Sequence, residues 1–302
     1  MTRFLLALVA LFAALAAPAT AQGRFVEFDQ PADIGQVHVT VWLPPGYDKD
    51  TKRRYPVLYM HDGQNVFFPK RSNFNKVWAA DKAALTLINA RKVAPFMIVA
   101  VDHPGPSRFL RYFPTRVVSA PLRQGTEGFA KGKLGGDEYL SFLGDTLKPV
   151  IDARYRTRPQ PRYTAVAGSS MGGLISLYAL TERADIFGKA AAVSTHSPLI
   201  DPDLLAKQPM MAAGVKADWK RYLSTRLGTP QGRKLWMDHG TETLDASYAP
   251  YQAVLDQGVA DAGWVRGKDF ESRVYKGTAH EENAWAARLP EMLGWLLADW
   301  RR

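Results

Sequence analysis

The 302-residue sequence contains no cysteine. This absence excludes disulfide bonds, thiolate metal sites, a cysteine nucleophile and lipid attachment through a thiol. The sequence also lacks long runs of like charge, although its formal net charge is +10. Its basic residues are dispersed and are not interleaved with aromatic residues as they are in nucleic-acid-binding modules. We therefore expect a solvated basic surface and no nucleic-acid partner.

Long hydrophobic runs are also missing, with one exception at the N-terminus. Arg3 precedes an apolar run over residues 4–17, and residues 19–21 form an A-x-A cleavage pattern. The run is shorter than the roughly 18 residues that a membrane-spanning helix needs. We therefore expect a signal peptide over residues 1–21, a single domain over residues 22–302, and a periplasmic or secreted protein without a stable membrane anchor. A domain of this length can bury enough core to fold without disulfides.

Beyond this leader, runs typical of strands alternate with runs typical of helices. Such alternation predicts an α/β fold with a mostly parallel central sheet and helices on both faces. The expected strands are residues 36–43, 55–61, 96–102, 163–168, 190–194, 234–238 and 271–275. The expected helices are residues 77–89, 139–153, 171–183, 248–261 and 282–300, the last divided at Pro290. Residues 104–136 and 197–233 fit no regular element, and we expect pocket walls or a lid there.

A short motif lies at one strand-to-helix junction of this pattern. Residues 168–172 read G-S-S-M-G, a G-x-S-x-G motif centred on Ser170, between an apolar β-like run and a run of helical period. In an α/β-hydrolase, such a sharp turn requires glycine on either side and presents the serine hydroxyl above the sheet. The motif predicts a nucleophile at Ser170; the alternative is an ordinary tight turn with a helix-capping serine.

A serine nucleophile needs a base, and the base needs an acid to orient it. In an α/β-hydrolase these groups follow in the order serine, acid, histidine. His280 comes after the last expected strand and fits this order as the base. The acid is open, because the loop D-H-G-T-E-T-L-D at residues 238–245 offers both Glu242 and Asp245, of which we narrowly favour Glu242. Asp238 lies close enough to the strand end to be structural.

Ester cleavage also needs hydrogen-bond donors for the oxyanion that develops during attack. The first expected donor is the backbone N–H of Met171, immediately after the nucleophile. The second is expected from the loop H-D-G-Q-N at residues 61–65, where Gly63 allows close approach and Gln64 supplies its N–H. Taken alone, this loop would be interpreted as an ordinary glycine-containing turn.

Five collinear segments resemble the esterase group that includes enterochelin esterases, feruloyl esterase modules, S-formylglutathione hydrolases and mycolyltransferases. They read Y-P-V-L-Y-M-H-D-G-Q-N-V-F from residue 55, G-G-D-E-Y-L-S-F-L from 135 with L-K-P-V-I-D ending at 152, A-G-S-S-M-G-G-L-I-S-L-Y from 167, D-H-G-T-E-T-L-D from 238 and H-E-E-N-A-W from 280. The resemblance implies an α/β-hydrolase fold, serine-dependent attack on esters, and no metal or organic cofactor. It assigns the nucleophile to Ser170, the base to His280 and the oxyanion donors to Gln64 and Met171, and it leaves the acid open.

The expected function is therefore hydrolysis of carboxylic esters by an exported serine esterase, through a Ser-His-acid triad and an acyl-enzyme. Arg108, Arg111, Tyr112 and Phe113 follow the third expected strand and are suited to hold a carboxylate, catecholate or phenolic group. We expect a small- or medium-sized ester of phenolic, glycan or siderophore type. The alternatives are an acyltransferase, in which an alcohol replaces water, and an inactive binding protein on the hydrolase scaffold.

Overall fold

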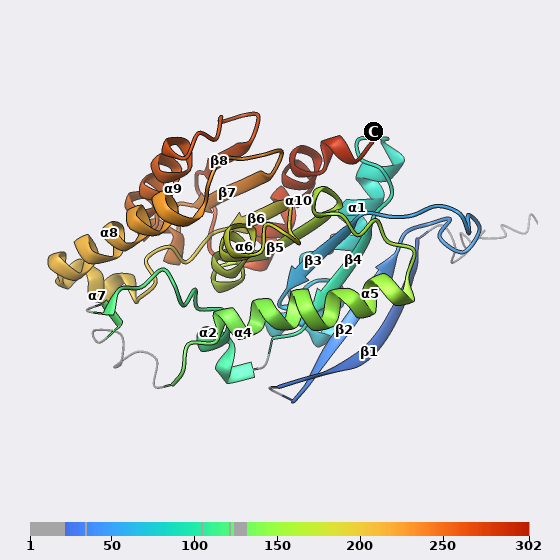
Figure 1. Ribbon diagram of the computed structural model, residues 1–302, viewed down its shortest axis with the longest axis horizontal. Helices are drawn as coiled ribbons and strands as arrows, with labels where there is room; N and C mark the ends of the chain where they lie inside the picture. The colour runs from blue at the N-terminus through green and yellow to red at the C-terminus, as the bar shows by residue number, and fades with distance from the viewer. Residues whose placement is uncertain (1–21, 34, 104, 121, 124–131, 302) are drawn as a thin grey trace, which may run out of the picture.

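The computed structural model describes residues 22–33, 35–103, 105–120, 122–123 and 132–301, so the expected signal peptide over residues 1–21 lies outside the described residues. Within them, an eight-stranded sheet has the order β1-β2-β4-β3-β5-β6-β7-β8 (Figure 1). The strands are β1 Arg24–Ala32, β2 Gly35–Leu43, β3 Val57–His61, β4 Met97–Val101, β5 Thr164–Ser169, β6 Lys189–Val193, β7 Lys234–Gly240 and β8 Phe270–Tyr275.

The sheet is parallel from β4 to β8 and antiparallel at the end formed by β1 and β2. The central strands β3, β4, β5 and β6 are buried along their whole length, as expected of parallel strands covered on both faces. The carboxyl ends of β3, β5, β6, β7 and β8 lie at one edge, where ligand sites of open α/β sheets form. Loops that leave this edge therefore converge in space although they are far apart in sequence.

Helices cover both faces of the sheet. Leu58 and Met60 of β3 pack into the core under α1 and α10, whereas the alternate residues Val57 and Tyr59 pack into the core on the other face, under α4, α5, α6, α8 and α9. The bounds are α1 Ala80–Asn89, α2 Arg108–Arg111, α4 Gly136–Ser141, α5 Lys148–Arg154, α6 Met171–Glu182, α7 Pro202–Lys207, α8 Pro209–Arg226, α9 Ala249–Asp261 and α10 Glu282–Leu296, with a π-helical stretch Phe142–Leu147 joining α4 to α5.

Short 3-10 helices occupy several connections: Gly63–Asn65, Pro69–Arg71, Asn73–Asn75, Gly105–Ser107, Pro161–Tyr163, Thr243–Ser247 and Ala298–Arg301. The mostly parallel sheet with helices on both faces is confirmed, and each expected strand and helix has a counterpart. No helix in the ranges that the structure describes is long and apolar enough to cross a membrane.

Four expectations about secondary structure were wrong. The described part of residues 104–136 contains the 3-10 helix Gly105–Ser107 and α2. Residues 197–233 contain α7 and the long helix α8, whose buried Val215, Trp219, Tyr222 and Leu223 recur at helical spacing. Pro290 does not divide the last helix, because α10 runs through it as far as Leu296. The apolar stripe of α10 packs against the sheet on both sides of the proline, which outweighs the one backbone hydrogen bond that proline removes. β1 was not expected; it is a partly exposed edge strand with little apolar periodicity.

Candidate active site

Ser170 occupies a strained turn between β5 and α6. Its backbone has φ 57° and ψ −121°, a combination that L-residues other than glycine rarely adopt and that proteins retain mainly at functional sites. Its N–H donates to Val193 O at 2.9 Å, which ties the turn to the end of β6. The glycines of the motif pack against each other, since a Cβ on Gly168 would lie 2.8 Å from the carbonyl carbon of Gly172. The turn therefore has no room for a side chain at residue 168.

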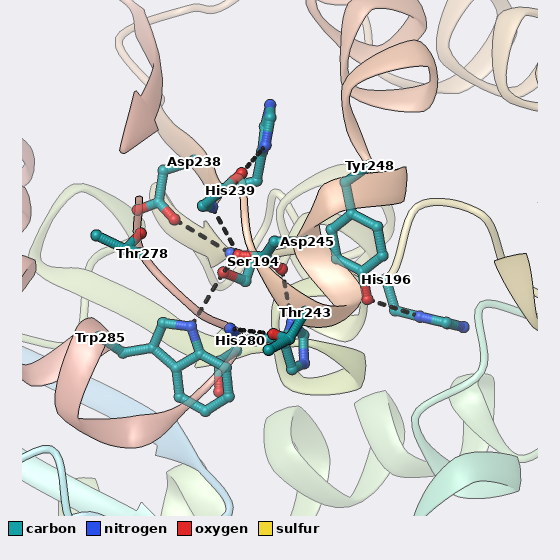
Figure 2. Close-up of polar contacts among 12 residues, drawn as sticks. Ser194, His196, Asp238, His239, Thr243, Asp245, Tyr248, Thr278, His280 and Trp285 are labelled. Atoms are coloured by element: carbon teal, nitrogen blue, oxygen red, sulfur yellow. Dashed lines mark hydrogen bonds and ion pairs between the residues drawn. The ribbon is translucent and has the colours of Figure 1, made fainter. Parts of the chain in front are cut away.

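His280 lies in the loop between β8 and α10 and lines the same cavity as Ser170, a hollow of about 270 Å³. Its backbone N–H donates to Thr243 Oγ1 at 2.9 Å. The rings of Tyr248 and Trp285 pack edge-on against the imidazole, with centroid distances of 5.7 Å and 5.0 Å. These contacts restrict how the ring can turn, so that one imidazole nitrogen is held toward the protein interior (Figure 2).

That interior nitrogen meets the carboxylate of Asp245: the distance from His280 Nδ1 to Asp245 Oδ1 is 2.6 Å. Asp245 is almost fully buried, and its Oδ2 accepts hydrogen bonds from Gly240 N and Ser194 Oγ, both at 2.6 Å. Burial alone would raise the pKa of Asp245, but the hydrogen bonds and the charge of His280 hold it below the ordinary value. An ionised carboxylate only accepts, so Nδ1 of His280 carries a proton and Nε2 is left as the basic nitrogen.

Of the two candidate acids, Asp245 lies beside His280 and Glu242 does not. Glu242 is exposed and precedes the 3-10 helix Thr243–Ser247, and its backbone N–H donates to Thr278 O. The 3-10 turn directs Asp245, three residues later, into the interior. Asp238 is buried and paired with Arg288 at 2.7 Å, in agreement with a structural position.

The two expected oxyanion donors lie at the carboxyl ends of adjacent strands. Met171 is the first residue of α6, and Gln64 lies within the 3-10 helix Gly63–Asn65 that follows β3. Backbone N–H groups in the first turn of a helix have no acceptor within that helix and are available to an anion. The side chain of Gln64 accepts from the backbone N–H of His103 at 3.3 Å, which fixes the loop against the end of β4.

An ion pair that the sequence did not reveal lies on the other side of the cavity. Asp62 follows β3 in the left-handed conformation (φ 55°), and both of its carboxylate oxygens accept from Arg108, at 2.6 Å each. Burial favours the neutral form of Asp62, but the guanidinium outweighs it and holds the pKa of this carboxyl below its usual range. Asp62 and Arg108 both line the cavity with Ser170. The charge of Arg108 is therefore already balanced within the protein.

The other three residues expected near the substrate do not line this cavity. Tyr112 and Phe113 are buried in the core, and the buried Arg111 stacks on the ring of Tyr139 at 5.3 Å. A further pair beside the site is formed by His196 and Tyr248, whose Nδ1 and Oη lie 2.9 Å apart. Burial lowers the pKa of His196 to about 4, so this histidine is neutral near neutral pH. The remaining lining of the cavity comprises Asn65, Asn73, Phe74, His103, Ser169, Glu282 and Trp285.

Comparison with known sequences gives a family match and several relatives, two of which follow. The family model described as "Putative esterase" matches residues 34–296. An endo-1,4-beta-xylanase/feruloyl esterase of Xylanibacter ruminicola is 29% identical over 262 residues, which are 83% of this chain and 28% of that protein. The uncharacterized protein YbbA of Bacillus subtilis (strain 168) is 24% identical over 160 residues, which are 53% of this chain and 57% of YbbA. The chain thus spans only part of the length of these curated relatives.

Solved structures share the architecture. An IroE-like serine hydrolase from Shewanella oneidensis superposes with a TM-score of 0.65 at 17% identity, over 89% of this chain and 80% of that one. The enterobactin esterase FES of Shigella flexneri gives a TM-score of 0.62 at 15% identity, over 91% and 58% of the two chains. At such identities the likeness concerns the fold, and the expected α/β-hydrolase fold is confirmed.

Proposed function

Because the chain belongs to the "Putative esterase" family, we propose that it hydrolyses carboxylic esters through a nucleophilic serine. One observation carries the proposal: Ser170, in a strained turn, shares a cavity with His280, whose Nδ1 is held 2.6 Å from a carboxylate oxygen of Asp245. These residue types, in this chain order, form the triad of an α/β-hydrolase. Asp245 takes the place of the acid, and Glu242 has no part in the reaction.

In the proposed mechanism, Ser170 Oγ attacks the ester carbonyl carbon while His280 Nε2 takes the hydroxyl proton. The carbonyl π electrons move onto oxygen, where the N–H groups of Met171 and Gln64 donate to the oxyanion. Asp245 stabilises the imidazolium. When the carbonyl re-forms, the ester C–O bond breaks and the alcohol leaves with the proton from His280. Water then attacks the acyl-enzyme with the same base, and the carboxylic acid is released from Ser170.

Labelling with a fluorophosphonate probe tests the nucleophile without knowledge of the substrate. We expect the wild-type protein to be labelled and Ser170→Ala to be unlabelled, with kcat on an active ester lowered by about 10⁴-fold or more. Ser176→Ala is a matched control, because it removes another serine hydroxyl, one that donates to Gly172 O within α6. Label that persists in Ser170→Ala, or a folded wild type that takes no label, would contradict the proposal.

We propose an aromatic acyl ester as the substrate class, with phenolic esters of glycans or of siderophores as its natural forms. Two aromatic side chains line the cavity beside Ser170, and one of them, Phe74, is 86% exposed. An aromatic ring of the substrate can pack against these side chains, and such ring contacts strengthen binding. The name of the Xylanibacter relative includes feruloyl esterase, and one of the solved neighbours is named an enterobactin esterase. Methyl esters of aromatic acids should exceed acetyl esters in kcat/KM; equal values would contradict this class.

Export is a further part of the proposal. It rests on the basic, apolar and A-x-A regions of residues 1–21, which lie outside the described residues. Expression of the full chain should yield a periplasmic or secreted protein that begins at Gln22, as measured by intact mass and N-terminal sequencing. A full-length chain confined to the cytoplasm would contradict export while leaving the esterase proposal untouched.

A further inference from the structure

A buried serine connects Asp245 to two donors on α10. Ser194 directly follows β6 and is fully buried. Its Oγ donates to Asp245 Oδ2 at 2.6 Å and accepts from Arg288 Nη2 at 2.6 Å and Trp285 Nε1 at 3.0 Å. Figure 2 shows the indole of Trp285 and the carboxylate of Asp245 on either side of the Ser194 hydroxyl. None of these contacts was expected from the sequence.

The direction of the Ser194 hydrogen bond follows from counting donors. A hydroxyl has one proton to donate and two lone pairs to accept with. The guanidinium of Arg288 and the indole N–H of Trp285 can only donate, so together they occupy both lone pairs. The one proton of Ser194 is then left for Asp245, which as an ionised carboxylate can only accept. The hydroxyl cannot reverse its direction without breaking several bonds at once.

The charges in this cluster are divided between two buried aspartates. Arg288 Nη2 lies 2.7 Å from Asp238 Oδ1, and Asp238 also accepts from the indole of Trp236 at 2.6 Å. Asp238 therefore balances the charge of Arg288. Among the residues that the structure describes, Asp245 receives only neutral donors apart from His280, namely the Ser194 hydroxyl and the Gly240 amide. Its negative charge is left to stabilise the imidazolium that forms on His280 during the reaction.

From these contacts we propose that Ser194 is a positioning residue for the acid of the triad. Together with the N–H of Gly240, its hydroxyl fixes the rotation of the Asp245 carboxylate, so that Oδ2 is occupied and Oδ1 faces His280. Ser194 acts through Asp245 and does not touch the reacting atoms. The inference rests on the proposed function, because positioning matters for the rate only if Asp245 serves His280 in ester hydrolysis.

The backbone at Ser194 makes a clean test possible. Its φ is 40°, in the left-handed region, where alanine is strained and glycine is not. Ser194→Ala and Ser194→Gly both remove the hydroxyl, but only Ser194→Gly relieves backbone strain. We expect both variants to lose about 10- to 100-fold in kcat, the factor that corresponds to one hydrogen bond to a charged group, with KM unchanged. A role in stability alone would instead let Ser194→Gly keep the wild-type kcat, and that result would overturn the proposal.

Ser197→Ala is the matched control. Ser197 lies in the same segment and is fully buried, but its Oγ has no hydrogen-bond partner among the described residues. We expect Ser197→Ala to keep the wild-type kcat. A loss equal to that of Ser194→Ala would mean that any buried hydroxyl of this segment matters, and would overturn the specific role of Ser194.

A second measurement does not depend on activity. Proton NMR of the wild-type protein should show the low-field resonance of a hydrogen-bonded His280 Nδ1–H, identified by its loss in His280→Ala. In Ser194→Gly we expect this resonance to shift or broaden, because only the N–H of Gly240 then holds the Oδ2 side of the Asp245 carboxylate. An unchanged resonance would contradict the positioning role. If the wild type shows no esterase activity but the resonance shifts, the proposed function fails and the inference about Asp245 orientation stands.

Discussion

Asp245 and Asp62 are buried carboxylates on opposite sides of Ser170, in the segments that follow β7 and β3. Both have a pKa held below the ordinary value by a basic partner, against the effect of burial. Asp62 faces Arg108, which is always charged, whereas Asp245 faces His280, whose imidazole takes up and returns a proton in the proposed mechanism. A carboxylate paired with a permanent cation can only hold structure. A carboxylate paired with a titratable base can stabilise a charge that appears during a reaction.

The largest expected effect comes from removing the charge of Asp245, the proposed acid of the triad. Asp245→Asn keeps the size of the side chain but neither stabilises the imidazolium nor fixes the tautomer of His280, so kcat should fall by about 10⁴-fold. Glu242→Gln is the matched control on the same loop, and since Glu242 is exposed we expect its kcat to match that of the wild type. Steady-state kinetics on one aromatic ester would decide. A large loss in Glu242→Gln with a small one in Asp245→Asn would reverse the assignment of the acid.

The local sequence predicts the turn at Ser170 but not the partners of the two aspartates. The turn at Ser170 could be predicted, because the two glycines that pack against each other are visible as G-x-S-x-G. The choice between Glu242 and Asp245 depends on Thr243, whose φ of 54° begins the 3-10 turn that directs one carboxylate inward. The local sequence does not predict that Thr243 adopts the left-handed backbone conformation. The pairing of Arg108 with Asp62 joins residues 46 positions apart, and only the assembled sheet edge brings them together.

The helices and strands also differ in how well the sequence predicts them. Buried strands could be predicted because they are continuous apolar runs, and α6 because its large apolar residues recur at helical spacing. The edge strand β1 was missed because half of its residues face solvent. In α8 the buried aromatic residues do recur at helical spacing. The helix is polar on average, however, so that this spacing was not recognised in the sequence. Local signals thus identify buried elements better than those on the periphery.

The second largest effect is expected at the buried ion pair between Arg108 and Asp62. Arg108→Met leaves the buried Asp62 carboxylate without its cation, and we expect the free energy of unfolding at pH 7 to fall by about 3 kcal/mol. Arg24→Met is the control: Arg24 pairs with Asp48 in the same bidentate geometry, but both side chains are exposed, so the loss should be far smaller. Urea denaturation of the three proteins would measure the difference. Equal losses for the two variants would contradict a special role for the buried pair.

The pH dependence of that loss has a definite sign. The pKa of Asp62 is lowered in the folded protein, so the ion pair contributes stability above the unfolded-state pKa of about 3.9. This contribution is lost as the pH falls through the lower, folded-state value. The gap between wild type and Arg108→Met should therefore be full at pH 7 and shrink in acid. A gap that grows as the pH falls would contradict the assignment of the charges.

The smallest expected effect concerns the charge of the substrate. Because Arg108 is balanced by Asp62, it offers no free cation to an anionic group, and the cavity also contains the carboxylate of Glu282, which accepts from Asn65 Nδ2 at 3.3 Å. We expect a neutral aromatic methyl ester to exceed its carboxylate-bearing analogue in kcat/KM by about 3-fold, the factor that like charges produce across a solvated pocket. Glu282→Gln removes the negative charge, so this preference for the neutral ester should narrow. The amide oxygen of glutamine can still accept from Asn65, which keeps the side chain in place. A preference for the anionic ester would mean that Arg108 leaves Asp62 to bind substrate. Asp62 would then not be purely structural, and its proposed contrast with Asp245 would fail.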